Sequence, residues 1–250
     1  MNIVVCVKRV PATDAPIKPA ADGISLDPSG VEFVLNPYDE FAVEEALKLK
    51  EAAGDGSVTV ITLGPSDAQK ELRTCLAMGA DKAILINSGD ARHDSFSTAE
   101  VLAAQIKTME CDLVLCGKQA IDGDDSQVGA RIATLLDFAC VTEVKALELN
   151  DGTFTATRDI EGAQEVVRCS SPAVLTAQKG LNEPRYASLK GIMAAKRKPL
   201  EEVAASEATP ATTVTSLSLP PARPEGRILG EGAGAVDALV DVLRNEAKVL

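Results

Sequence analysis

The sequence contains no tryptophan, and aromatic residues make up only 3% of its 250 positions. The core must therefore be built from valine, isoleucine, leucine and alanine, a composition typical of α/β proteins with buried parallel strands. No segment approaches the roughly 18 consecutive apolar residues that a membrane-spanning helix needs. We therefore expect no membrane insertion.

Cysteine pairs with the spacing of a metal site are also absent. The six cysteines are scattered, without a CxxC motif, and most lie in apolar patterns where cysteine acts as a small hydrophobic residue. The first residues lack the charged, apolar and cleavage regions of a signal peptide. These absences predict no metal site and favour a reducing, cytoplasmic location.

Histidine occurs once, at His93, so the usual catalytic triads cannot be assembled. This residue lies in a polar loop and is expected to be solvated. The net charge of -12 argues against nucleic acid as the main partner. No catalytic residue is predicted, and any chemistry has to come from a cofactor.

Apolar runs that alternate with helical patterns predict the fold class. Strands are expected at 2–7, 58–63, 82–86 and 112–116. The helices between them are expected to begin at Asn36 as an N-cap, at capping boxes formed by Ser66 with Gln69 and by Ser97 with Glu100, and at Ser126. This alternation predicts an α/β fold with a doubly wound, mainly parallel sheet of the Rossmann-like type.

The pattern changes after Cys140. The segments 141–149, 153–160 and 165–169 predict an antiparallel β insertion, and 174–178 is expected to return to the main sheet. From 201 the chain is rich in proline, alanine, serine and threonine, which predicts an extended C-terminal arm. The arm ends in a helix whose apolar stripe must pack on this chain or on another subunit; the stripe comprises Val236, Leu239, Val240 and Leu243.

A ligand site is expected where parallel strands end, because ligands bind at the carboxyl edge of open α/β sheets. Four connections qualify, at 6–10, 35–39, 63–66 and 117–129. The last reads GKQAIDGDDSQVG and runs into a helix N-terminus, which suits phosphate. The two standard nucleotide loops, GxGxxG and GxxxxGK[ST], are absent, so the residues alone leave open a nucleotide site and an ordinary strand-helix connection.

A second candidate surface covers 181–198, with the sequence LNEPRYASLKGIMAAKRK. Its apolar Leu189 stands between polar residues on a short element that begins with a proline turn. A basic cluster accompanies it, formed by Lys190, Lys196, Arg197 and Lys198. The segment is either a docking surface for a partner or a surface loop followed by a solvated helix.

Five blocks in a fixed order resemble the β (small) subunit of electron transfer flavoproteins. They read VCVKRVP, NPYDEFAVEEALKLKE, LRTCLAMGAD, GKQAIDGDDSQVG and LNEPRYASLKGIMAAKRK, and the likeness runs from Met1 to about Leu200. The resemblance implies a heterodimer with a larger α subunit that carries a redox-active FAD. This subunit would be an electron carrier, not an enzyme in itself, between acyl-CoA dehydrogenases and a quinone- or ferredoxin-linked acceptor.

The resemblance also implies a second cofactor in this subunit, which is AMP in ordinary members and a second FAD in electron-bifurcating members. The loop IDGDDSQVG leans towards the bifurcating and nitrogen-fixation-linked branch. If FAD binds, Cys6, Lys8 and Arg9 would lie near the isoalloxazine or the phosphates. The implied cofactor contacts are Cys6, Asn36, Pro37, Tyr38, Asp39, Leu63, Gly117, Lys118, Gln119, Ala120, Ile121, Asp122, Gly123, Asp124, Asp125, Ser126, Gln127 and Val128.

The resemblance further makes 181–198 a recognition loop for acyl-CoA dehydrogenases, with Leu189 as its anchor. Its neighbours would be Pro184, Arg185, Tyr186, Ile192 and Met193. Ala194 and Arg197 replace lysines of ordinary members, so regulation through those lysines is not expected. The predicted organisation is a nucleotide-binding domain over 1–200 and, over 201–250, an arm and helix that contact the partner subunit.

Two alternatives remain from the residues themselves. The first is a stand-alone adenine-nucleotide-binding module of the universal-stress or ATP-hydrolysing α/β type, which shares the sheet. The second is a structural protein whose basic cluster binds an acidic surface. Charge reversal in that cluster would abolish such binding, whereas loss of Leu189 would not.

Overall fold

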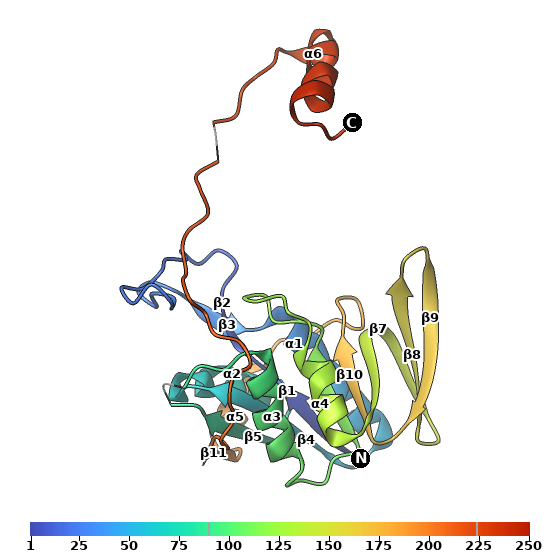
Figure 1. Ribbon diagram of the computed structural model, residues 1–250. Helices are drawn as coiled ribbons and strands as arrows, with labels where there is room; N and C mark the ends of the chain where they lie inside the picture. The colour runs from blue at the N-terminus through green and yellow to red at the C-terminus, as the bar shows by residue number, and fades with distance from the viewer. Residues whose placement is uncertain (90, 224) are drawn as a thin grey trace.

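A nine-stranded mixed sheet forms the centre of the molecule (Figure 1). The structure is a computed structural model, and it describes residues 1–89, 91–223 and 225–250. The strand order is β11-β5-β4-β1-β6-β10-β7-β8-β9, and the first seven of these strands run parallel to one another. The predicted α/β class with a mainly parallel sheet is thereby confirmed.

The strands lie close to the predicted segments. Their bounds are β1 (Asn2–Cys6), β4 (Ser57–Gly64), β5 (Lys82–Asn87), β6 (Leu113–Gly117), β7 (Ala139–Asn150), β8 (Thr153–Ile160), β9 (Ala163–Ser170), β10 (Ala173–Ala177) and β11 (Leu200–Ala204). A separate two-stranded sheet joins β2 (Arg9–Pro11) to β3 (Phe33–Leu35).

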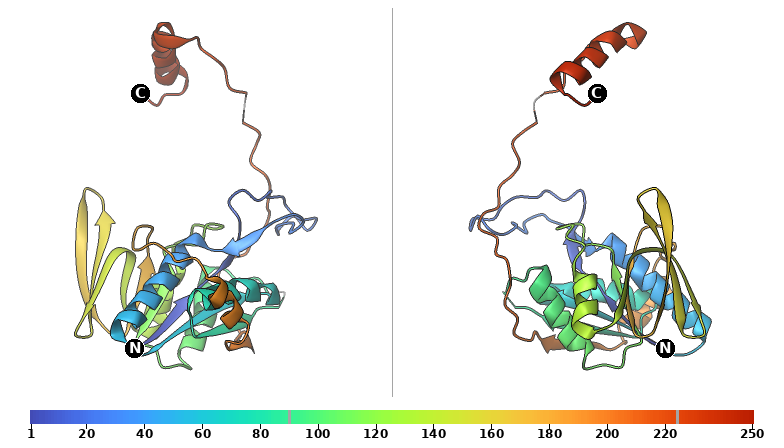
Figure 2. Two further views of the ribbon diagram at one scale, coloured as in Figure 1. Left: turned by 180° about the vertical axis from the view of Figure 1, so that it is seen from behind. Right: turned by 45° about the vertical axis from the view of Figure 1, so that its right-hand side comes forward.

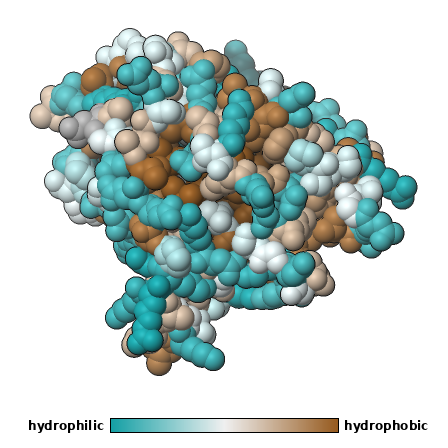
Figure 3. All heavy atoms as spheres, turned by 90° about the horizontal axis from the view of Figure 1, so that it is seen from below, coloured by the Kyte–Doolittle hydropathy of each residue, from teal (hydrophilic) through white to brown (hydrophobic). Residues whose placement is uncertain are grey.

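Helices cover both faces of the sheet. The helices are α1 (Pro37–Ala53), α2 (Gln69–Met78), α3 (Ser95–Ile106), α4 (Val128–Leu136), α5 (Leu189–Ala195) and α6 (Val236–Asp241). Alternation along β1 explains the two layers: Ile3 and Val5 face the core under α1 and α2, whereas Val4 and Cys6 face the core under α3 and α4. Polar side chains cover much of the underside and leave apolar areas exposed between them (Figure 3).

The antiparallel strands are continuous with the main sheet. β10 returns between β6 and β7, as expected, and pairs in parallel with both. β7 then pairs antiparallel with β8, and β8 with β9, so this region extends one edge of the sheet (Figure 2).

Three helix starts differ from the predictions. α4 begins at Val128 with Gln127 as its N-cap, not at the expected Ser126. α3 begins at Ser95, because Asp94 is the N-cap and forms the capping box with Ser97; the expected box of Ser97 with Glu100 was wrong. Ser66 lies in a short 3-10 turn and makes no cap hydrogen bond, because its hydroxyl instead accepts one from Asn87 Nδ2 at 3.1 Å. Both serines thus have partners that sequence spacing did not indicate.

The C-terminal segment begins with an edge strand. Residues 200–204 pair in parallel with β5, so the sheet continues into the segment where we expected the arm. Beyond it the chain leaves the body, and α6 lies apart from the sheet (Figures 1 and 2). Val236 and Leu239 on this helix are about half exposed. None of the described helices is long and apolar enough to cross a membrane.

Candidate functional site

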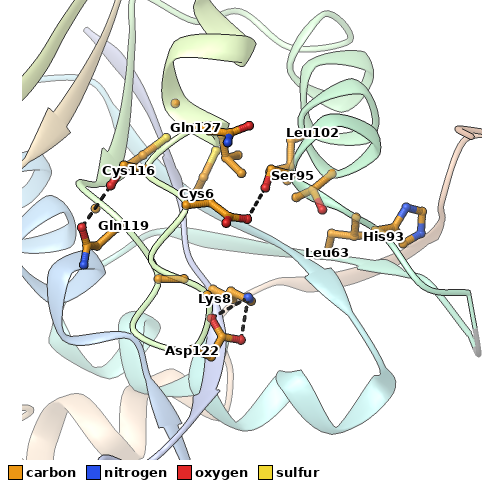
Figure 4. A pocket seen from close by; sticks show the side chains of 18 of the residues that line it. Cys6, Lys8, Leu63, His93, Ser95, Leu102, Cys116, Gln119, Asp122 and Gln127 are labelled. Carbon is orange, nitrogen blue, oxygen red and sulfur yellow. Dashed lines mark hydrogen bonds and ion pairs between the residues drawn. The ribbon is translucent and has the colours of Figure 1, made fainter. Parts of the chain in front are cut away.

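A cavity of about 330 Å³ lies where β1, β4 and β6 end, between the N-termini of α3 and α4 (Figure 4). Of the predicted cofactor contacts, the following line it: Cys6, Asp39, Leu63, Gly117, Lys118, Gln119, Ala120, Asp122, Gly123, Asp124, Asp125, Ser126, Gln127 and Val128. The sequence-predicted loops therefore meet at one edge of the sheet, as the carboxyl ends of parallel strands must.

Four predicted contacts, Asn36, Pro37, Tyr38 and Ile121, lie outside the cavity lining. Asn36 is fully buried and holds the loop instead: its Nδ2 donates to the carbonyl of Gln119 at 2.9 Å, and its Oδ1 accepts from the N–H of Ile121 at 3.2 Å. Asn36 does precede α1, but its side chain makes no cap hydrogen bond. It supports the cavity from behind.

A buried carboxylate fixes the ends of two strands. Asp39 Oδ2 accepts from the backbone N–H of Lys8 at 2.7 Å, and Oδ1 accepts from the N–H of Gly117 at 3.1 Å. Burial raises the pKa of Asp39 to about 7, against the opposing effect of these hydrogen bonds. Gly117 allows this approach, since a Cβ there would lie 2.3 Å from Asp39 Oδ1.

The three acids of the loop each have a donor. Asp122 accepts from Lys8 Nζ at 2.7 and 2.8 Å, and Asp124 accepts from Gln119 Nε2 at 2.6 Å. Asp125 accepts from the hydroxyl of Ser95, and both residues line the cavity. The carboxylates are thus engaged within the loop and with its neighbours, which reduces their repulsion of a phosphate.

The floor of the cavity is a pair of thiols. Cys6 and Cys116 are register partners on β1 and β6, and both are buried. Hydrogen bonding to Cys116, together with burial, holds the pKa of the Cys6 thiol well above its usual value. A neutral thiol is a poor nucleophile, so this floor offers an apolar contact surface.

The second wall of the cavity was missed from the sequence. The missed residues of this wall are Ser88, Ala91, His93, Asp94, Ser95, Thr98 and Leu102, and Cys116 of the floor was also not named. Val7, Lys8 and Gly129 fall inside the predicted connections at 6–10 and 117–129. The N-cap pattern of Asp94 with Ser97 was the available signal. His93 is not solvated as expected: its Nδ1 lies 3.3 Å from Ser97 Oγ, and its Nε2 is buried without a partner among the described residues.

The segment 181–198 forms a separate, exposed surface. Leu189 opens α5 and is 79% exposed, and Tyr186, Ile192 and Met193 are also exposed. Pro184 and Arg185 are partly buried, and Arg185 forms ion pairs with glutamates of α1. This surface lies on α2, across the sheet from α3 and α4, so the structure does not bring it to the cavity.

Rigid contacts hold α5 in place. Arg73 donates to the carbonyls of Ala195 and Lys198 at 2.6 and 3.0 Å, and Lys198 Nζ donates to the carbonyls of Leu76 and Ala80 at 3.0 and 2.6 Å. Lys198 is therefore a structural residue, and its expected place in a surface basic cluster was wrong.

Fold and cavity together define a doubly wound α/β protein with a ligand-sized cavity at the strand ends. Comparison with known proteins then places it more closely. Residues 24–208 match the family model of the electron transfer flavoprotein domain. The chain belongs to the electron transfer flavoprotein family, among its β (small) subunits, which confirms the resemblance and does not favour the stand-alone module.

Relatives from several organisms match most or all of the chain. It is 45% identical to the electron transfer flavoprotein subunit beta of Bacillus subtilis, and 38% identical to that of Bradyrhizobium diazoefficiens, over 100% of both chains in each comparison. It is also 40% identical to the caffeyl-CoA reductase-Etf complex subunit CarD of Acetobacterium woodii, over 92% of each chain.

Substitution of Gly129 by alanine is expected to destabilise the cavity wall. A Cβ there would lie 2.5 Å from Thr176 Cγ2, so α4 must shift, at about 1–3 kcal/mol of unfolding free energy. Gly123→Ala in the same loop is the matched control, because its nearest neighbour would be 3.8 Å away. Urea unfolding measures both, and equal stabilities of the two variants would contradict the packing argument.

Asp39 is expected to make stability pH-dependent. Its folded pKa of about 7 exceeds the unfolded value of about 3.9, so the folded state binds the proton more tightly between these values. This contribution to stability is present at acidic pH and is lost as the pH rises towards 7, by up to roughly 4 kcal/mol. Asp39→Asn should remove that slope from unfolding free energies measured between pH 4 and 8. A wild type that gains stability over the variant as pH rises would contradict the assignment.

Proposed function

We propose that this chain binds an adenine nucleotide at the strand-end cavity, as the small subunit of a heterodimer whose α subunit carries the redox-active FAD. The complex would pass electrons from acyl-CoA dehydrogenases to a quinone- or ferredoxin-linked acceptor. Family membership supports the heterodimer and the flavin. The nucleotide proposal rests on the cavity, which is lined both by the N-terminus of α4, where a phosphate could bind, and by an apolar floor.

The N-terminus of α4 is the proposed phosphate position. Its N-cap, Gln127, makes no side-chain cap hydrogen bond, so first-turn N–H groups remain available for an anion. Gly129 in that turn lets the helix approach β10 closely. Lys8 lines the cavity as an ion pair with Asp122, so that it offsets the charge of this acid near the phosphate position. The thiol floor with Leu63 and Leu102 suits the apolar face of a base.

AMP and a second FAD share the adenosine-phosphate portion that this cavity would hold. The loop IDGDDSQVG favours the branch with FAD, and the similarity to a CarD subunit of an Etf complex supports a place near such complexes. We propose FAD as the first candidate and AMP as the alternative. The free thiols of all six cysteines support a reducing, cytoplasmic location.

The exposed surface around Leu189 is proposed to dock the dehydrogenase. An apolar side chain on an anchored helix loses little conformational freedom on binding, so its burial in a partner's pocket contributes more net affinity. Exposed Lys190 and Lys196 lie at its rim. Such a small patch suits a transient electron-transfer encounter.

The C-terminal arm is proposed to reach the α subunit. Val236 and Leu239 on α6 are about half exposed, and Leu217 and Leu219 earlier in the arm are also exposed. A short amphipathic helix is marginal in water by itself. Burial against the partner subunit would supply the missing packing.

The cofactor content of the purified heterodimer tests the nucleotide proposal. We expect one adenine nucleotide per β chain in addition to the FAD of the α subunit, because the cavity would retain it through purification. Two flavins per pair would identify FAD, and one flavin with released AMP would identify AMP. Denatured heterodimer that releases only the single FAD would overturn the proposal.

Leu189→Ala is expected to weaken binding to the acyl-CoA dehydrogenase by roughly 2–4 kcal/mol, because it removes a buried anchor. Surface plasmon resonance measures the Kd. Val166→Ala is the control, since Val166 is 61% exposed on β9, far from this surface. Lys196→Glu should mainly alter the association rate and its salt dependence. Unchanged binding by Leu189→Ala, with lost binding by Lys196→Glu, would instead favour the acidic-surface alternative.

A further inference from the structure

One carboxylate at the cavity mouth joins the nucleotide cavity to the start of the C-terminal arm. We propose that Asp94 is a positioning residue, which couples occupancy of the cavity to the attachment of the arm through the first turn of α3. This inference rests on the proposed nucleotide site. It concerns Asp94 and Ser95 on one side and Ala211 and Thr212 on the other.

The first oxygen of Asp94 fixes the helix. Oδ1 accepts from the backbone N–H of Ser97 at 2.9 Å and from its hydroxyl at 3.0 Å. The second oxygen holds the arm. Oδ2 accepts from the N–H groups of Ala211 and Thr212, both at 2.9 Å, and from the hydroxyl of Thr212 at 3.1 Å. One side chain thus receives five donors from two segments more than a hundred residues apart.

The same turn contacts the nucleotide loop. Ser95, the residue after Asp94, donates its hydroxyl to Asp125, and all three residues line the cavity. Because both bonded side chains line the cavity, a ligand bound there would lie against the bond between Ser95 and Asp125 and could rearrange it. Any shift of this turn moves Asp94, and with it the Oδ2 atom that accepts the hydrogen bonds of the arm.

Neighbouring contacts stiffen this connection. Arg92 donates to Asp22 Oδ2 at 2.8 Å and to the carbonyl of Ile24 at 3.0 Å, both in the segment between β2 and β3. The same segment receives the arm again, where Leu217 N–H donates to the carbonyl of Gly23 at 2.7 Å. The arm is therefore held at two places: at Asp94 itself, and at the segment between β2 and β3. Arg92 joins that segment to the turn of Asp94.

Charge favours this arrangement. Hydrogen bonds from Ser97, and further ones from Thr212, hold the pKa of Asp94 well below its usual range. The carboxylate is therefore ionised at neutral pH, and its bonds to the arm are charge-assisted. Thermodynamic linkage then requires reciprocity: if the ligand tightens the arm, an attached arm tightens the ligand by the same factor.

The test uses the full-length chain, freed of bound nucleotide, with AMP and FAD as the two probes. Titration calorimetry gives their Kd, and hydrogen exchange reports on the amides of Ala211 and Thr212. We expect the bound probe to slow exchange at these amides about fivefold to twentyfold, a typical range for coupled sites. The affected residues of the arm lie outside the cavity lining, so a structural role of Asp94 alone would not produce this result.

Variants on both sides of the contact complete the test. Asp94→Asn keeps an N-cap residue of equal quality, but its amide N–H groups would face the N–H groups of the arm. The double variant Ala211→Pro with Thr212→Val removes donors on the arm alone. Both variants should raise the Kd of the probe by the same factor by which the bound probe slows exchange at the amides of Ala211 and Thr212. Thr213→Val, the adjacent threonine without a described hydrogen bond, should bind as wild type.

Two results would overturn the coupling: exchange at 211 and 212 that ignores a bound probe, or arm variants that bind with wild-type affinity. Because the arm variants leave the body unchanged, a folding defect of Asp94→Asn does not obscure the outcome. Failure of both probes to bind wild type would overturn the nucleotide site itself, and the coupling with it.

Discussion

The carboxylate of Asp39 accepts the N–H groups of Lys8 and Gly117, and the rest of the site depends on this pair of bonds. β1 and β6 are adjacent in the sheet, but the chain leaves each strand in a different direction. The buried carboxylate of Asp39, at the start of α1, binds the chain at the end of both strands and so holds them to one helix. From this fixed point Lys8 reaches the cavity mouth and residues 118–127 close over it. Gly117 is necessary because any side chain would occupy the position of the carboxylate.

The loop also resolves the difficulty of placing acids beside a proposed phosphate in a chain of net charge -12. Local pairing decides the outcome, since Coulomb effects at hydrogen-bond distance outweigh the distant charge. Lys8 neutralises Asp122, while Gln119 and Ser95 satisfy Asp124 and Asp125. Left-handed backbone at Asp124 and Ser126 turns the chain between these contacts. The acids therefore shape the loop, and the helix end of α4 remains free for an anion.

Most strands of the sheet, their mainly parallel direction and the strand-end loops were predictable, because apolar periodicity and strand length are local properties of the sequence. The edge strand β11 was not, since its segment was expected to be part of the arm. Contacts between distant segments were not. Asp94 and Ser97 are equally good N-caps by type, and only the structure shows Ser97 buried at the third helical position. The fixed position of Lys198 depends on carbonyls 118 and 122 residues away in the chain. No periodicity in the sequence reports such pairs.

The cavity lies at the strand ends beside α3 and α4, whereas the proposed docking surface packs on α2, on the other side of the sheet. Exposure of Leu189 is unfavourable in the free protein, and a flexible loop could bury it by collapsing. α5 prevents this collapse, because Arg73 and Lys198 bind backbone carbonyls across α2 and α5. Gly191 brings the helix against the carbonyl of Ala77, where a Cβ would lie 2.3 Å away. The contacts of α5 therefore keep Leu189 exposed on a fixed helix, as its proposed docking role requires, and none of them involves a residue that lines the cavity.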